Sequence, residues 1–103
     1  MNKYILYVGL NDKDSKKQDI TTLSAREVIM NTITANDLGG GTVSEAVGIY
    51  KHEDGTIVTE QTLRVEILFA TDTQIASICD TLKKALNQES IAVEKQVITS
   101  TLI

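Results

Sequence analysis

The sequence predicts an α+β fold of the ferredoxin-like βαββαβ type, with a four-stranded antiparallel sheet and two helices on one face. Four segments alternate apolar and polar residues, as strands do, and two segments have apolar residues at helical spacing. The length of 103 residues fits one hydrophobic core, so we predict a single domain over residues 1–103. Right-handed crossovers between these strands give the sheet order 4-1-3-2.

The first strand is predicted over residues 3–10, where Tyr4, Leu6 and Val8 alternate with a second set of largely apolar residues. Such a pattern indicates a strand that is buried over most of its length. Residues 11–19 are polar or charged throughout, which is typical of a solvated loop.

The first helix is predicted to begin at Ser24, because Ser24 and Glu27 have the spacing of a capping box. A start one turn earlier, at Thr21 or Thr22, is the alternative. Three consecutive glycines follow soon afterwards, so the helix should end near Asn36.

The second and third strands are predicted over residues 42–51 and 56–70, joined by a tight turn at residues 52–55. Their alternation, taken with that of the first strand, predicts which side chains face the helices. These are Leu6, Val8, Val43, Val47, Ile49, Leu63, Val65, Ile67 and Phe69.

The second helix should begin at about Asp72, because Thr71 and Gln74 have capping-box spacing. Cys79 lies on the apolar stripe of this helix, where a small core residue is a better interpretation than a catalytic thiol. The last strand is predicted over about residues 90–100.

Charge and composition restrict the possible partners and compartment. Ten basic and fourteen acidic residues give a formal net charge of −4, which offers no general attraction to nucleic acid or to an anionic membrane surface. The single cysteine cannot form an intrachain disulfide, and no apolar run approaches the length of a membrane span. We therefore predict a cytoplasmic protein without nucleic-acid or membrane partners.

No cofactor or metal is predicted. The only histidine, His52, lies in a charged turn with no cysteine or second histidine nearby to complete a zinc site. We interpret it as a solvated turn residue.

The sheet face opposite the helices is predicted to be too apolar for solvent alone, which favours a homodimer formed through this face. A face that is merely solvated is the alternative. The predicted interface residues are Ile5, Tyr7, Ala46, Gly48, Tyr50, Glu66, Leu68 and Ile98.

Arg64 and Glu66 form the one polar group on this face, with Tyr7 and Tyr50 near them. One interpretation is a cross-strand ion pair within the dimer interface. The other is a pocket in which Arg64 holds a carboxylate or phosphate and the tyrosines supply hydrogen bonds.

Five short segments together resemble a known family. The segments are residues 6–10 (LYVGL), 41–43 (GTV), 48–50 (GIY), 54–60 (DGTIVTE) and 88–91 (QESI). In order and spacing they resemble the family called domain of unknown function 3574. This resemblance implies no activity, substrate or catalytic residue.

The resemblance directs attention to Glu60 and to the junction Gln88, Glu89 and Ser90. These side chains either satisfy backbone groups at a helix end and a strand start, or line a polar pocket at one end of the sheet that the oligomer shares.

The function that fits these observations best is a noncatalytic homodimer that binds a small molecule or a protein partner. One alternative is a small enzyme of the dimeric α/β-barrel type, which would use Glu60, Tyr7 or Arg64 in acid-base chemistry on a small polar substrate. The other is a structural module of a larger assembly. No catalytic residue is assigned.

Overall fold

The computed structural model describes residues 1–103 apart from the side chain of Tyr50. The predicted contributions of Tyr50 to the binding site and the interface therefore lie outside the described residues. Along the chain follow β1 (Asn2–Gly9), α1 (Thr22–Ala35), β2 (Thr42–Lys51), β3 (Ile57–Leu68), α2 (Asp72–Ala85) and β4 (Ala92–Val97). This βαββαβ order is the predicted one.

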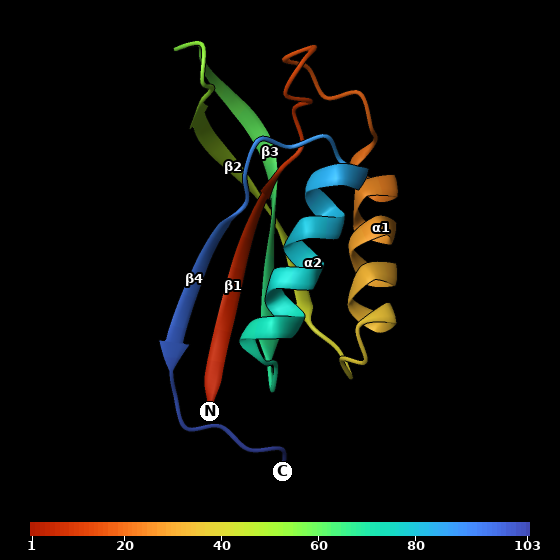
Figure 1. Cartoon of the computed structure of the whole chain (residues 1–103), viewed down its shortest axis with the longest axis vertical. Helices are drawn as coiled ribbons and strands as arrows, with labels where there is room; N and C mark the ends of the chain where they lie inside the picture. The colour runs from red at the N-terminus through yellow and green to blue at the C-terminus, as the bar shows by residue number, and fades with distance from the viewer.

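The strands form one antiparallel sheet in the order β2-β3-β1-β4, which is the predicted 4-1-3-2 order in reverse. Both helices cover the same face and lie side by side along it, and the opposite face is open (Figure 1). The prediction of a ferredoxin-like fold is confirmed.

The hydrophobic core lies between the sheet and the two helices. Each buried aliphatic side chain in it stabilises the fold by about 1.5–3 kcal/mol. Its fully buried members come from β1, α1, β3 and α2 and include Leu6, Val8, Ile29, Leu63, Val65, Ile67, Ile78 and Leu82.

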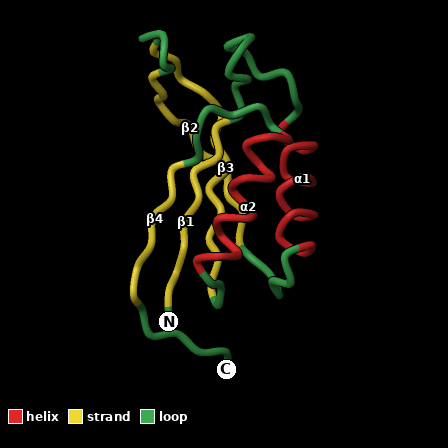
Figure 2. Tube along the Cα trace, viewed as in Figure 1, coloured by secondary structure: helices red, strands yellow, loops and turns green.

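Three residues predicted to face the core are exposed, so that part of the prediction is wrong. Val47 and Ile49 do lie on the helix side of β2, yet 71% and 79% of their surfaces are accessible. The molecule is 43 Å long, whereas a 14-residue helix measures about 21 Å, so the β2–β3 hairpin extends past the helices (Figure 2). Phe69 is 51% exposed because β3 ends at Leu68 and a positive φ of 59° at Phe69 breaks the alternation.

The helix starts follow local capping chemistry. The hydroxyl of Thr21 accepts a hydrogen bond from the backbone N–H of Ser24, so the alternative start is confirmed and the Ser24–Glu27 capping box is wrong. In α2 the predicted capping box is confirmed: Thr71 accepts from the N–H of Gln74, and the Gln74 side chain accepts from the N–H of Thr71.

Among the described residues, no helix has the length and apolar character to cross a membrane.

Candidate ligand-binding pocket on the open sheet face

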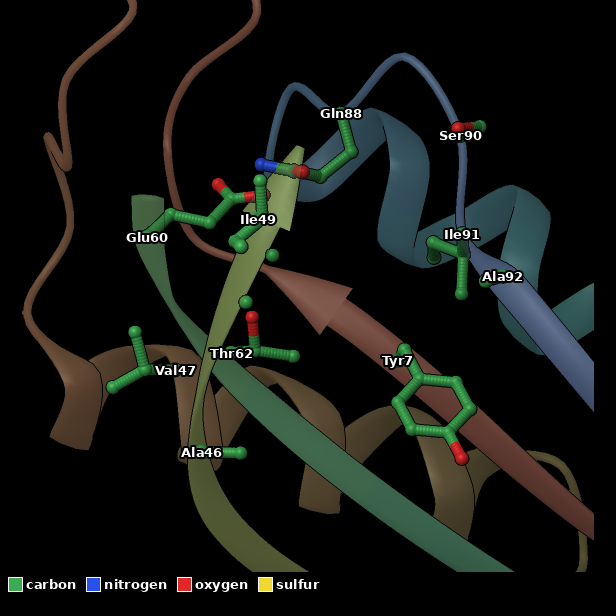
Figure 3. Close-up of a pocket in the computed structure, with 12 residues that line it drawn as sticks. Tyr7, Ala46, Val47, Ile49, Glu60, Thr62, Gln88, Ser90, Ile91 and Ala92 are labelled. Carbon is green, nitrogen blue, oxygen red and sulfur yellow. The ribbon is translucent and has the colours of Figure 1, made fainter. Parts of the chain in front are cut away.

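A cavity of about 420 Å³ lies on the open side of the sheet, between the β2–β3 hairpin and the junction of α2 with β4 (Figure 3). Its volume lies within the range of about 300–1,000 Å³ that is typical of small-molecule sites. Residues from four segments line it: Tyr7 and Gly9 of β1, residues 46–49 of β2, Glu60 and Thr62 of β3, and Gln88 with residues 90–92 at the junction.

Two glycines make room for the polar side chains of this pocket. A Cβ atom at Gly9 would come within 2.6 Å of Cδ of Glu60, so the Glu60 carboxylate occupies the space above β1. A Cβ atom at Gly48 would similarly come within 2.6 Å of Oγ1 of Thr62. Larger residues at positions 9 and 48 would displace Glu60 and Thr62, which are each only 8% exposed.

Glu60 and Gln88 are connected through the backbone of Asn11. The N–H of Asn11 donates to Oε2 of Glu60 at 2.9 Å, and Nε2 of Gln88 donates to the Asn11 carbonyl oxygen at 2.8 Å. The Gln88 amide also donates to the carbonyl of Leu86 at 3.2 Å, at the end of α2. The two side chains point to the same end of the pocket, away from the ring of Tyr7 (Figure 3).

The Glu60 carboxylate is nearly buried and incompletely partnered. Among the described residues, its Oε1 atom accepts no hydrogen bond, and the carboxylate forms no salt bridge. Burying a charged group is costly unless it is paired and hydrogen-bonded. The arrangement therefore leaves one carboxylate oxygen for a group that enters the pocket.

Arg64 does not line this pocket and is already engaged. Its Nη1 atom lies 2.5 Å from Oε1 of Glu66, which also forms an ion pair with Lys3 at 3.7 Å. The hydrogen bond to Glu66, followed by Tyr7, raises the pKa of Arg64, and Arg64 lowers the pKa of Glu66 in turn. Arg64 and Glu66 are both on β3, so their ion pair lies within one strand and not between two.

Glu89 contacts the hairpin instead of the pocket. Its Oε1 atom lies 3.6 Å from Nδ1 of His52 and accepts a hydrogen bond from the N–H of Glu53 at 3.3 Å. His52 is only 3% exposed, so its interpretation as a solvated turn residue is wrong. The α2–β4 junction, 37 positions further along the chain, contacts this turn, and no local sequence signal indicates such burial.

Of the predicted ligand-binding residues, the structure brings Tyr7, Glu60, Gln88 and Ser90 together around the pocket, and it places Arg64 and Glu89 outside it. Sequence reasoning missed Gly9, Asn11 and Thr62 as parts of the site. Glycine inside a strand often marks the close approach of another group, so Gly9 could have indicated from the sequence that a side chain packs over this strand.

The predicted interface residues are distributed over the whole open face. Ala46 and Tyr7 are exposed, Gly48, Glu66, Leu68 and Ile98 are half-buried, and Ile5 is 2% exposed. Glu66, Leu68 and Ile98 line a second cavity, of about 720 Å³, at the opposite end of the sheet. Lys3 and Glu66 form an ion pair there, whereas the first cavity contains the incompletely partnered carboxylate of Glu60.

Metal binding has no support in the geometry of the described residues. Among them, no three histidine, cysteine, aspartate or glutamate side chains are grouped so that they could hold a metal ion. Burial raises the pKa of the Cys79 thiol, which disfavours the thiolate that metal binding or nucleophilic attack requires.

The fold and site define a ferredoxin-like α+β domain with a small pocket on its open sheet face. The chain belongs to the family described as Protein of unknown function (DUF3574), which matches residues 3–101. The resemblance inferred from the short segments is thus confirmed. No curated protein matches the chain.

Several solved structures share the fold. A phage SAM lyase in complex with S-methyl-5'-thioadenosine is similar with a TM-score of 0.74 and 20% identity, over 92% of this chain and 79% of that chain. The periplasmic divalent cation tolerance protein CutA from Archaeoglobus fulgidus is similar with a TM-score of 0.62 and 15% identity, over 99% and 88%. A DUF3240 family protein from Shewanella baltica is similar with a TM-score of 0.56 and 11% identity, over 99% and 97%.

Proposed function

We propose that the protein is a noncatalytic homodimer that binds a small adenine nucleoside with a sulfur-containing side chain in the pocket near Glu60. The observation that carries this proposal is the nearly buried Glu60 carboxylate at one end of a cavity with mainly apolar walls. Such a combination is typical of small-molecule sites, in which a few polar groups orient a largely apolar ligand.

The choice of ligand class combines the pocket with the fold comparison. Tyr7 offers an aromatic surface at the end of the pocket opposite Glu60, and Ala46 and Ala92 provide apolar walls on the open face. A flat base and a thioether are suited to these surfaces. The phage SAM lyase of similar fold was solved with a ligand of this class, S-methyl-5'-thioadenosine.

Dimer formation through the open face is the second part of the proposal. The pocket opens on this face, so a second copy placed there would cover it. Tyr7 is 36% exposed, and Leu68 is half-buried, so both have apolar surface left for a partner. The lone cysteine of the chain is compatible with the reducing cytoplasm, which is where we place the protein.

Two measurements test this function. Light scattering should give twice the chain mass of 11.3 kDa, falling to the chain mass in Tyr7→Glu or Leu68→Glu.

Calorimetry with S-methyl-5'-thioadenosine should show binding that Ala92→Trp removes, because Ala92 lines the pocket. The matched control is Ala76→Trp, which changes an exposed residue of α2 and should leave binding intact. A monomeric wild-type protein would contradict the dimer, and the absence of binding would contradict the ligand class.

Catalysis is the second candidate function, and it is favoured by the position of Glu60. A nearly buried carboxylate with a free oxygen in a cavity has the placement of a general base, and Tyr7 lines the same cavity. Incubation with S-adenosylmethionine, followed by chromatography for S-methyl-5'-thioadenosine, separates the two functions. A noncatalytic protein forms no product above the spontaneous rate. Product that disappears in Glu60→Gln would establish an enzyme instead.

A further inference from the structure

We propose that the pocket selects a cationic ligand, a sulfonium nucleoside of the S-adenosylmethionine class, whose positive charge lies against Oε1 of Glu60. This inference rests on the proposed function and specifies its ligand further. It arises from three features of Glu60: its burial, its missing counter-charge and its fixed orientation.

The protein does not supply a counter-charge for Glu60. The side chain is 92% buried, and the N–H of Asn11 is its only hydrogen-bond donor among the described residues. Arg64, the basic residue nearest to it along β3, is engaged by Glu66. Burying a carboxylate without a cation is costly, and a ligand that carries the cation removes this cost.

The orientation of the carboxylate is set before any ligand arrives. The N–H of Asn11 holds Oε2, and Gln88 holds Asn11 by its carbonyl oxygen. The absence of a side chain at Gly9 allows the carboxylate to lie over β1. Oε1 lies over Gly9 and accepts no hydrogen bond from the described residues, so it is the oxygen left for the ligand, and little rearrangement is needed on binding.

Other ligand chemistries fit these features less well. A metal ion requires several protein ligands, and the described residues contain no group of three or more histidine, cysteine, aspartate or glutamate side chains that could hold one. A neutral hydroxyl or amide would hydrogen-bond Oε1 but leave the negative charge uncompensated. An organic cation with an aromatic group satisfies both ends of the pocket, because Tyr7 lies at the end opposite Glu60.

Two ligands that differ by one methyl group and one positive charge test this inference. S-adenosylmethionine contains a sulfonium ion, and S-adenosylhomocysteine is the matching thioether, which is neutral at sulfur and has the same amino-acid tail. Calorimetry with the intact protein should show S-adenosylmethionine binding about tenfold or more tightly, because the sulfonium charge faces a carboxylate in a largely buried site. In Glu60→Gln this preference should fall to about threefold or less, because the carboxamide is neutral and similar in shape.

A matched control is Glu45→Gln, which removes a carboxylate from the helix side of β2, outside the pocket. It should keep the wild-type preference. Glu60→Gln should also raise the melting temperature of the ligand-free protein, because a buried uncompensated charge is lost, and this measurement verifies that the variant is folded.

The outcomes separate this inference from the proposed function. Equal affinity of the wild-type protein for the two nucleosides would overturn the contact between the sulfonium and Glu60, and with it this inference, and leave nucleoside binding standing. A preference that persists in Glu60→Gln would overturn the role of Glu60. No binding of either nucleoside, or of S-methyl-5'-thioadenosine, would overturn both proposals.

Discussion

The carboxylate of Glu60 occupies the place above β1 that a side chain at Gly9 would fill. The two residues are 51 positions apart, yet a Cβ atom at position 9 would come within 2.6 Å of Cδ of Glu60. Moving the Glu60 side chain away from position 9 would break its hydrogen bond from the N–H of Asn11. The geometry of the pocket therefore depends on a glycine in a strand.

We predict that Gly9→Ala lowers the free energy of unfolding by about 1–3 kcal/mol, the usual cost of overpacking. Urea unfolding followed by circular dichroism measures this. In a Glu60→Ala background the same substitution should cost less, since the clashing carboxylate is absent. Gly40→Ala is the control, because nothing lies within 4 Å of its new Cβ atom. Equal costs with and without Glu60 would contradict the proposed steric contact.

Two valines on the helix side of the sheet should contribute very differently to stability, because the helices cover only one of them. Val65 is fully buried, whereas Val47 is 71% exposed on the hairpin beyond the helices. Val65→Ala should therefore lower the free energy of unfolding by about 1–3 kcal/mol, and Val47→Ala by less than about 0.5 kcal/mol. Thermal or urea unfolding of the two variants checks this. Similar losses would mean that Val47 is also covered, for example by a second copy.

Capping predicts the effect of a threonine substitution at the start of α2. Thr71→Ala removes the acceptor for the N–H of Gln74 and should cost about 1 kcal/mol in the free energy of unfolding. Thr73→Ala, two residues further on, is a matched control at an exposed helical position, where alanine has the higher helix propensity. Its stability should equal or exceed that of the wild type. A loss as large as that of Thr71→Ala would contradict the assigned cap.

The hydrogen bonds of Asp12 predict part of the loss of protein stability at acid pH. Hydrogen bonds from the side chain of Asn87, and then from the N–H groups of Ser15 and Asp14, hold the pKa of Asp12 below its ordinary value. A lowered folded-state pKa stabilises the protein above the unfolded value of about 3.9, and this contribution is lost as the pH falls through the folded-state pKa.

Asp12→Asn should therefore be less stable than the wild type at pH 7, and the difference should shrink as the pH falls below about 4. Melting temperatures between about pH 2 and pH 7 measure both effects. Asp80→Asn serves as the control, since it removes only an exposed pair with Lys84 on α2. A difference that stays constant with pH would show that the charge of Asp12 is not responsible.

The sequence by itself determined the order of the elements, the sheet topology and the start of α2. Alternation with a period of two and apolar spacing near 3.6 are local properties, and the capping box of Thr71 and Gln74 spans only four residues. Right-handed crossovers then left one arrangement for four strands and two helices. The sequence alone also indicated Glu60 and Gln88 as candidate site residues, because both are polar and lie in segments that resemble the family.

Only the tertiary structure decided which of these residues meet. Strand alternation places Val47 and Ile49 on the helix side, but their exposure depends on where the helices end, which is a property of three dimensions. The burial of His52 requires the α2–β4 junction to reach the hairpin turn. Likewise, the backbone of Asn11 connects Glu60 with Gln88 across segments 49 and 77 positions away. Contacts of this kind arise from packing between distant segments, because local periodicity specifies a side chain's direction but not its neighbour.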